Sequence, residues 1–258
     1  MSASGGSLAH VALVAAQLGA DAIRTVVRAG DLDISTKANA HDFVTAADHA
    51  ADAAILRTLL SARPADAVLS EESGRRAGTS GVTWVVDPLD GTMNFVHRRD
   101  DYAVSVGAER DGDFVAGALV RPTTGDWIAG GEGVSVARDT VPGVTGTTDL
   151  SSVIFSVGLA GDDDLRVRIM EVLTDLMPQV RDFRRTGSSA CDLMAVALGQ
   201  LDVYLGYGVN DWDVAAGVAV VRAAGGVAGW IDTASGVPLI AAGSPAVLDP
   251  FVERAAKV

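Results

Sequence analysis

An apolar run leads directly into two aspartates at residues 84–95, Trp84-Val85-Val86-Asp87-Pro88-Leu89-Asp90-Gly91-Thr92-Met93-Asn94-Phe95. The first residues predict a β-strand that ends at Asp87, where Pro88 interrupts the strand pairing and a turn follows. Two carboxylates at this spacing after a strand suit a divalent cation, because magnesium prefers oxygen ligands. A strand followed by an ordinary Asx-type turn explains the same pattern equally well.

Four further acidic residues are candidates for the same chemistry. Glu71 and Glu72 end another short β-rich run, where one of them is a candidate ligand or general base. The alternative is that both lie in a solvated loop. Asp48 and Asp213 each stand at the start of a predicted helix, where capping of the helix end is the simpler interpretation.

The segment Gly187-Ser188-Ser189 precedes a predicted helix, whose free backbone N–H groups are suited to bind an anion. Serines before a helix are more often simple caps. Arg184 and Arg185 stand just upstream, where they either face an anionic substrate or lie on the surface.

Several other chemistries are excluded by the residues present. Ala197 stands where a cysteine-dependent phosphatase built on Cys191 requires an arginine. Neither of the two lysines, Lys37 and Lys257, follows the glycine pattern of an ATP-binding phosphate loop. The four histidines lack metal-binding spacing, so we expect them to be structural or surface residues.

The composition predicts a folded, acidic protein. Its 258 residues contain 33 acids against 20 bases, a net charge of −13 that repels nucleic acid and anionic membranes. Such a protein holds a phosphate only if something local reverses the charge, as bound cations would. The first seven residues do not resemble a secretory signal, and no uncharged apolar run reaches the roughly 20 residues of a membrane span. We expect a cytoplasmic protein without nucleic-acid or membrane partners.

Helices and strands alternate along most of the chain. Residues 140–149 are rich in Gly, Thr and Pro without periodicity, so we expect two α/β subdomains, 1–145 and 146–258. The predicted helices cover 8–30, 46–62, 165–177, 190–198 and 214–224, and the predicted strands cover 67–69, 83–86, 102–109, 114–121, 153–157, 180–183 and 203–205.

In combination these segments resemble the inositol monophosphatase family, a group of magnesium-dependent, often lithium-sensitive phosphomonoesterases. The resemblance rests on several motifs in the family's order: Lys37, Asp42-Phe43-Val44-Thr45-Ala46-Ala47-Asp48, Glu71-Glu72-Ser73, Asp87 to Phe95, Trp212-Asp213-Val214-Ala215-Ala216-Gly217 and Gly225-Gly226. It implies an α/β (α+β) fold, a layered α/β/α/β/α sandwich of the sugar-phosphatase type. It also implies a homodimer.

The resemblance assigns a role to each matching residue. Glu71, Asp87 and the Leu89 carbonyl match ligands of a first Mg²⁺, while Asp87, Asp90 and Asp213 match ligands of a second. Glu71 also matches a residue that helps to hold a third, weaker ion. Thr92 and Asp48 match the pair that positions the attacking water together with Glu71. Lys37 matches a basic residue at the mouth of the site. The residues that match the phosphate and substrate contacts are Gly91, Thr92, Ser188, Ser189, Gly206 and Asp213.

Substrate specificity departs from the family pattern. Gly206 stands where inositol-specific members carry a glutamate that contacts a sugar hydroxyl, and the Ser189 hydroxyl compensates for it in part. The segment 130–144 is shortened relative to the family hairpin. We expect Mg²⁺-dependent hydrolysis of a small phosphorylated metabolite, with inositol-1-phosphate first. The alternatives are histidinol phosphate, fructose-1,6-bisphosphate or phosphoadenosine phosphate as substrate, or a non-catalytic metal-binding regulatory protein.

Overall fold

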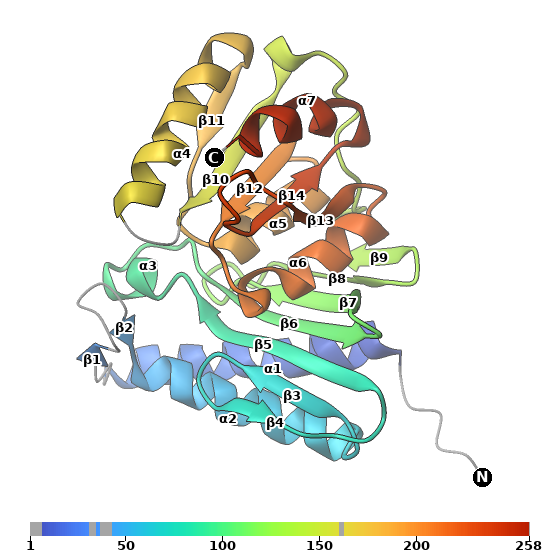
Figure 1. The fold of residues 1–258 in the computed structure, drawn as a ribbon. Helices are drawn as coiled ribbons and strands as arrows, with labels where there is room; N and C mark the ends of the chain where they lie inside the picture. Colours follow the sequence, from blue (N-terminus) through green and yellow to red (C-terminus); the bar gives the residue numbers. More distant parts are fainter. Residues whose placement is uncertain (1–6, 31–34, 37–42, 160–162, 258) are drawn as a thin grey trace.

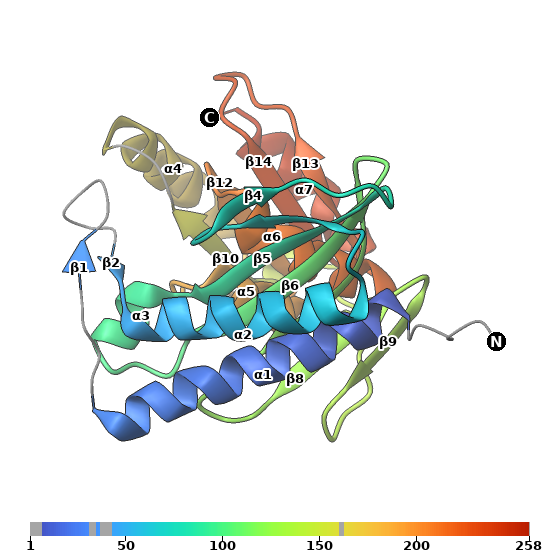
Figure 2. The ribbon, with the colours of Figure 1, turned by 90° about the horizontal axis from the view of Figure 1, so that it is seen from below.

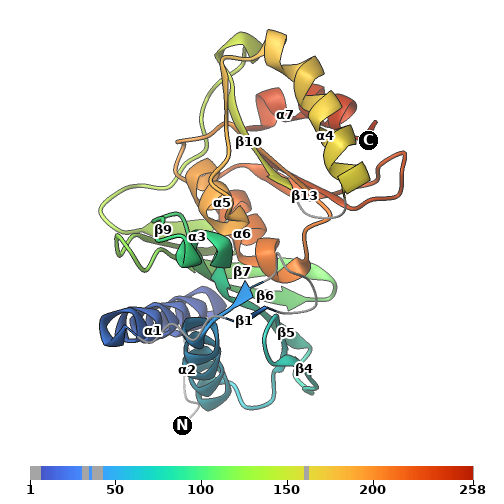
Figure 3. The ribbon, with the colours of Figure 1, turned by 90° about the vertical axis from the view of Figure 1, so that its left-hand side faces the viewer.

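Five layers of helices and sheets alternate in the computed structural model, which describes residues 7–30, 35–36, 43–159 and 163–257 (Figure 1). A helix pair, a seven-stranded sheet, a second helix pair, a five-stranded sheet and two outer helices follow one another (Figure 3). The predicted α/β/α/β/α sandwich is therefore confirmed. The helices are α1 (Leu8–Ala29), α2 (Ala46–Ala62), α3 (Thr92–Val96), α4 (Asp163–Leu176), α5 (Ser189–Ala197), α6 (Asp211–Ala223) and α7 (Pro245–Ala255).

The seven-stranded sheet has the strand order β4-β3-β5-β6-β7-β8-β9. Strands β3 and β5 are parallel, and all other neighbours are antiparallel. Because β3 and β5 run in the same direction, the residues that follow them emerge at the same edge of the sheet. The strands are β3 (Ala67–Ser70), β4 (Gly74–Arg76), β5 (Val82–Asp90), β6 (Ala103–Arg110), β7 (Asp113–Val120), β8 (Trp127–Gly131) and β9 (Val134–Ala137).

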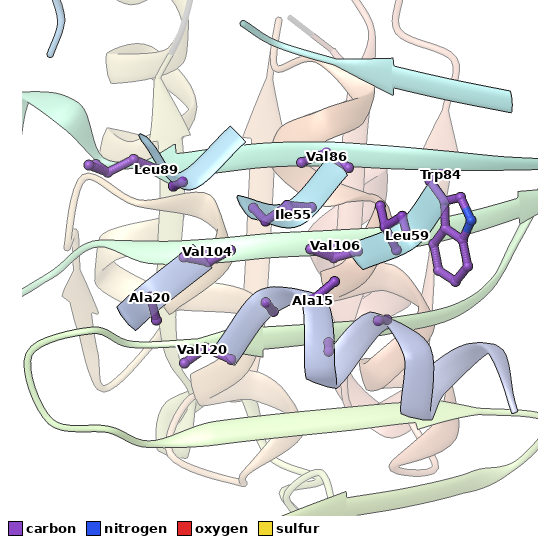
Figure 4. Close-up of a cluster of buried hydrophobic side chains, with 14 of the residues drawn as sticks. Ala15, Ala20, Ile55, Leu59, Trp84, Val86, Leu89, Val104, Val106 and Val120 are labelled. Carbon is purple, nitrogen blue, oxygen red and sulfur yellow. The ribbon is translucent and has the colours of Figure 1, made fainter. Parts of the chain in front are cut away.

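Helices α1 and α2 lie side by side across the outer face of this sheet (Figure 2). Small residues such as Ala15 and Ala20 let α1 approach the strands closely, and Ile55 and Leu59 of α2 fill the space beside it (Figure 4). The facing strand residues in the same cluster include Trp84, Val86, Leu89, Val104, Val106 and Val120 (Figure 4). This packing fixes the position of β5, whose end carries the candidate site.

Helix α6 covers the inner face of the same sheet, together with α5. Two glycines allow this close approach, because side chains in their place would collide with α6. A Cβ at Gly107 would lie 2.7 Å from the Ala215 Cβ, and one at Gly117 would lie 2.5 Å from the Ala216 Cα. The N-terminal turn of α6, with Asp213, is thereby held against the sheet.

The five-stranded sheet has the order β11-β10-β12-β14-β13 and is mixed. Helices α4 and α7 pack on its outer face through an apolar cluster that includes Ile169, Phe155 and Phe251. A separate two-stranded pair is formed by β1 (Ser35–Thr36) and β2 (Phe43–Val44). The five strands are β10 (Ile154–Leu159), β11 (Asp182–Arg184), β12 (Val203–Tyr207), β13 (Val227–Ile231) and β14 (Leu239–Gly243).

Most predicted elements are present, with shifted ends. The strand predicted at 180–183 lies at 182–184, because a 3₁₀ turn at Met177–Gln179 intervenes, and α6 begins at Asp211 rather than Val214. The predictions did not include β1, β2, β4, β8, β9, β13, β14, α3 or α7. The stretch 141–149 forms no helix or strand and connects the two sheets. The division into subdomains 1–145 and 146–258 stays a prediction.

By length and composition, α1 is the one described helix that is apolar enough to cross a membrane. It nevertheless carries Asp21 and Arg24, and its buried stripe packs against α2 and the seven-stranded sheet. Its apolar character is accounted for by this contact, so we assign α1 to the protein core.

A candidate metal centre at the end of strand β5

Strand β5 ends in an irregular turn that brings Asp87 and Asp90 to the same side. Pairing with β6 shifts by one residue between these two positions, which leaves room for Pro88 in the strand. The Leu89 N–H donates to Asp87 Oδ1 over 2.9 Å. Gly91 follows with φ of 96°, a left-handed conformation that favours glycine, and turns the chain into α3.

Asp213 joins these two aspartates from the first turn of α6. One carboxylate oxygen from each of Asp87, Asp90 and Asp213 lies within 4.8 Å of the others. Asp213 Oδ2 also accepts a hydrogen bond of 2.8 Å from the Asn210 N–H. Asp213 therefore caps its helix and faces the cluster at once, so the two interpretations of this residue are compatible.

The three carboxylates are partly or fully buried and repel one another when they are charged. Burial and neighbouring carboxylates raise the pKa of Asp90 to about 7 and that of Asp213 to about 8. For Asp87, burial and then the charges of Glu71, Asp90 and Asp213 raise the pKa well above its usual value. Bound cations would relieve this repulsion.

Glu71 lies directly beside the cluster. It follows β3, and its N–H donates to the Val86 carbonyl of β5 over 3.0 Å. Its negative charge contributes to the raised pKa of Asp48, Asp87, Asp90 and Asp213. The parallel pairing of β3 and β5 thus brings Glu71 to the edge where β5 ends.

Thr92 and Asp48 meet at the same edge. Thr92 Oγ1 lies 3.3 Å from Asp48 Oδ1 and 3.1 Å from the Leu89 carbonyl oxygen. Asp48 Oδ2 accepts from both the N–H and the hydroxyl of Thr45, over 2.8 and 2.6 Å, in the capping box of α2. Asp48 is thus another residue that both caps a helix and faces the candidate site.

The donor set fits a hard divalent cation. The clustered groups are carboxylates, without histidine or cysteine, and Mg²⁺ prefers such oxygen ligands. The buried Leu89 supplies a carbonyl oxygen nearby. When bound, magnesium ions neutralise phosphate charge and lower the pKa of a coordinated water.

Comparison with known proteins identifies the family. The inositol monophosphatase family model matches residues 7–248. The chain belongs to the inositol monophosphatase family. Inositol-1-monophosphatase SuhB of Mycobacterium tuberculosis is 39% identical over 212 residues, 78% of this chain and 73% of the relative. Nus factor SuhB of Escherichia coli is 33% identical over 222 residues, 84% of this chain and 83% of the relative.

Solved structures of the family share the whole fold. The crystal structure of extragenic suppressor protein suhB from Bartonella henselae has a TM-score of 0.86 and 30% identity. The similarity covers 98% of this chain and 99% of the other. The observed layers are therefore those of the inositol monophosphatase fold.

The N-terminus of α5 holds one of the clustered carboxylates in this family member. Asp90 Oδ2 accepts 2.6 Å hydrogen bonds from the Ser188 hydroxyl and the Ala190 N–H. Ser188 Oγ in turn accepts from the Cys191 N–H and caps the helix. Ser188 is therefore a cap, as its simpler interpretation states, and a partner of Asp90.

Ser189 and Gly206 both lie next to the hydroxyl of Tyr204. The Tyr204 hydroxyl donates to Ser189 Oγ over 2.7 Å, and a Cβ at Gly206 would lie 2.7 Å from the same Tyr204 oxygen. Gly91 is adjacent as well, since a Cβ there would lie 3.3 Å from the Ser188 Cβ.

Sequence patterns missed two residues that support the site, Asn94 and Asp192. Asn94 Nδ2 donates to the carbonyls of Asp101 and Thr186, which ties α3 to the loop before α5. The buried Asp192 accepts a 2.9 Å hydrogen bond from the Thr186 hydroxyl. Asn94 lies within the quoted 84–95 stretch, but its partners are up to 92 residues away, so only the fold reveals its role.

The remaining candidates lie elsewhere. Arg184 is 54% exposed and pairs with Asp182, which agrees with its surface alternative. His10, His49 and His97 are exposed, and Cys191 is a buried free thiol whose pKa burial raises to about 12. Lys37, Asp42 and His41 lie outside the described residues. The segment 130–144 contains the tight hairpin between β8 and β9.

Proposed function

We propose that this protein is a Mg²⁺-dependent phosphatase that hydrolyses small phosphate monoesters, with inositol-1-phosphate as its leading substrate. The convergence of Asp87, Asp90 and Asp213 carries the proposal. The relatives named inositol-1-monophosphatase, at up to 39% identity, support the choice of substrate. A cytoplasmic location and a homodimeric state belong to the same proposal.

The metal ligands are divided between two principal ions. Glu71, Asp87 and the Leu89 carbonyl would hold the first, and Asp87, Asp90 and Asp213 the second. A third, weaker ion would use Glu71. Ser188 and the Ala190 N–H keep Asp90 oriented through their hydrogen bonds to Oδ2, which leaves Oδ1 as the available ligand atom.

Thr92 and Asp48 would position the attacking water together with Glu71. The Thr92 hydroxyl has one proton, which points to Asp48 Oδ1 or to the Leu89 carbonyl. Its oxygen lone pairs are then free to accept a proton of the water and orient it toward phosphorus. Backbone N–H groups of Gly91 and Thr92 would contact the phosphate, and Asp213, Ser188, Ser189 and Gly206 would line the substrate side.

A phosphate-release assay tests this function. Wild-type protein is incubated with inositol-1-phosphate, histidinol phosphate, fructose-1,6-bisphosphate and phosphoadenosine phosphate, in Mg²⁺ and in EDTA. We expect Mg²⁺-dependent release that is fastest with inositol-1-phosphate and inhibited by millimolar lithium. Fastest release from another substrate would select that alternative.

A regulatory role without turnover is the second candidate. The Escherichia coli relative that is 33% identical is named a Nus factor rather than a phosphatase. Absence of release from every substrate in Mg²⁺, with Mg²⁺ binding retained in calorimetry, would favour this role over catalysis.

A further inference from the structure

Two glycines face each other on neighbouring strands beside the candidate site. Gly158 of β10 pairs in register with Gly206 of β12. A Cβ at Gly158 would lie 2.5 Å from the Tyr204 hydroxyl oxygen, and one at Gly206 would lie 2.7 Å from it. The paired glycines therefore form a notch that a single phenol hydroxyl occupies.

Tyr204 uses this notch to reach the first residue of α5. The Tyr204 side chain is fully buried, and its hydroxyl donates to Ser189 Oγ over 2.7 Å. Burial raises the pKa of Tyr204 well above its usual value, so the phenol keeps its proton and remains a donor. Ser189 is half-buried and stands between Ser188 and Ala190, the two residues that bind Asp90.

The direction of this hydrogen bond determines what Ser189 offers to a ligand. A serine hydroxyl has one proton and two lone pairs, and Tyr204 occupies one lone pair. Among the described residues, the Ser189 hydroxyl makes no further hydrogen bond as a donor. Its proton is consequently available to an acceptor atom outside the protein.

We propose that Tyr204 is a positioning residue that sets substrate specificity by holding Ser189 as an outward hydrogen-bond donor to a hydroxyl oxygen of a polyol phosphate. The inference rests on the proposed phosphatase function. Position 206 is a glycine without a side-chain acceptor, so the polar group that this chain presents here is the donating hydroxyl of Ser189 on α5. Polyol esters gain this contact, whereas esters without further oxygen atoms do not.

Tyr204→Phe tests the proposal, because the ring remains in the notch while the donor is lost. The values of kcat and KM are measured in Mg²⁺ for inositol-1-phosphate and for phenyl phosphate, which has no hydroxyl beyond the ester. One lost hydrogen bond predicts a fall in kcat/KM for inositol-1-phosphate of roughly 5- to 10-fold, mostly through KM. For phenyl phosphate we expect a change within about twofold, since its alcohol part makes no such contact.

A double-mutant cycle separates this role from a general effect on folding. Ser189→Ala should reproduce the loss for inositol-1-phosphate, and the double variant should lose no more than either single variant. Tyr207→Phe is the matched control. Tyr207 lies on the same strand but bonds to the Ala255 carbonyl on the opposite, outer face, so its variant should leave the substrate ratio unchanged.

The outcomes distinguish this proposal from the function on which it rests. If wild-type protein releases no phosphate from either ester, the phosphatase function fails and the specificity role fails with it. If wild-type protein is active but Tyr204→Phe and Ser189→Ala leave the ratio of the two kcat/KM values unchanged, only the specificity role is overturned. If Tyr204→Phe does not fold, an unchanged ratio of the two kcat/KM values in Ser189→Ala is by itself enough to overturn the specificity role.

Discussion

Asp87 is the most enclosed carboxylate of the candidate metal centre. Its side chain is 1% exposed, and Glu71, Asp90 and Asp213 all add to the raised pKa that burial gives it. It is also the ligand shared by both proposed ions. A neutral amide at this position removes one negative charge from each ion site at nearly constant shape.

We expect Asp87→Asn to lower the turnover of inositol-1-phosphate by at least ~10²-fold, as follows when a shared metal ligand is lost. The fold should remain intact, since the amide removes repulsion from the apo site. Phosphate release and circular dichroism measure the two effects.

Asp232→Asn provides the control for this variant. Asp232 is an exposed aspartate in the loop after β13, outside the cluster, so its substitution should change neither activity nor fold. Near-normal activity in Asp87→Asn would refute the assignment of Asp87 as a shared ligand.

Three helix N-termini converge on the candidate site. Asp48 lies in the first turn of α2, Ser188 caps α5, and Asp213 lies in the first turn of α6. The positive end of a helix dipole favours negative charge. Part of the positive potential that carboxylates and a phosphate need here thus comes from the backbone in this acidic protein, and the proposed cations would supply the rest.

Thr45→Ala should affect both the stability of α2 and catalysis. Loss of the cap costs about 1 kcal/mol of unfolding free energy. Asp48 also loses the 2.6 Å hydrogen bond from the Thr45 hydroxyl, so its alignment with Thr92 should loosen and kcat should fall. Urea unfolding and phosphate release measure the two effects.

Ser7→Ala is the matched control, because Ser7 caps α1 away from the site. It should reduce stability in the same way without changing kcat. An equal effect of both variants on kcat would show that Thr45 influences catalysis only through general stability.

Asp192 should make the stability of the loop before α5 depend on pH. Burial raises its pKa to about 7 against 3.8 for a free side chain, although the Thr186 hydrogen bond opposes this shift. The folded protein therefore holds a proton that the unfolded chain releases near pH 4. This contribution to stability is complete below about pH 4 and is lost as pH rises through about 7.

Asp192→Asn, which stays neutral, should flatten the fall in unfolding free energy between about pH 4 and pH 7. The difference in slope is at most about 1.4 kcal/mol per pH unit for one proton. Urea unfolding at several pH values measures it. Asp149→Asn should leave the slope as in wild type, because hydrogen bonds from Ser151 lower the pKa of Asp149. Parallel slopes for wild type and Asp192→Asn would contradict the prediction.

Sequence patterns predict a helix or strand best when the residues within that segment determine its structure, without contacts to distant parts of the chain. Periodic apolar residues gave the position of α1, and the strand–turn pattern gave Asp87 and Asp90 at the end of β5. Patterns could not separate a cap from a site residue at Asp48 and Asp213, because each carboxylate caps its helix and also faces the candidate site. Tyr204 carried no local signal, since its role depends on glycines in two different strands.

At the scale of the whole molecule, the candidate site joins separate layers. Asp87 and Asp90 come from the seven-stranded sheet, while Asp213 comes from the helix layer behind it, more than a hundred residues later in the sequence. The family resemblance, rather than any local pattern, gave the five-layer order. Close packing of α6 against Gly107 and Gly117 is what makes the approach of these carboxylates possible.

Because ions bound here would connect β5 to α6, Mg²⁺ should stabilise the protein against unfolding. A ligand that binds only the folded state adds about 2.7 kcal/mol at a concentration of 100 times its Kd. We therefore expect the thermal unfolding midpoint of EDTA-treated protein to rise as Mg²⁺ is added, and Asp213→Asn to show a smaller rise. Asp232→Asn should respond like wild type. An unchanged midpoint in wild type, or an undiminished rise in Asp213→Asn, would mean that no ion links the two layers through Asp213.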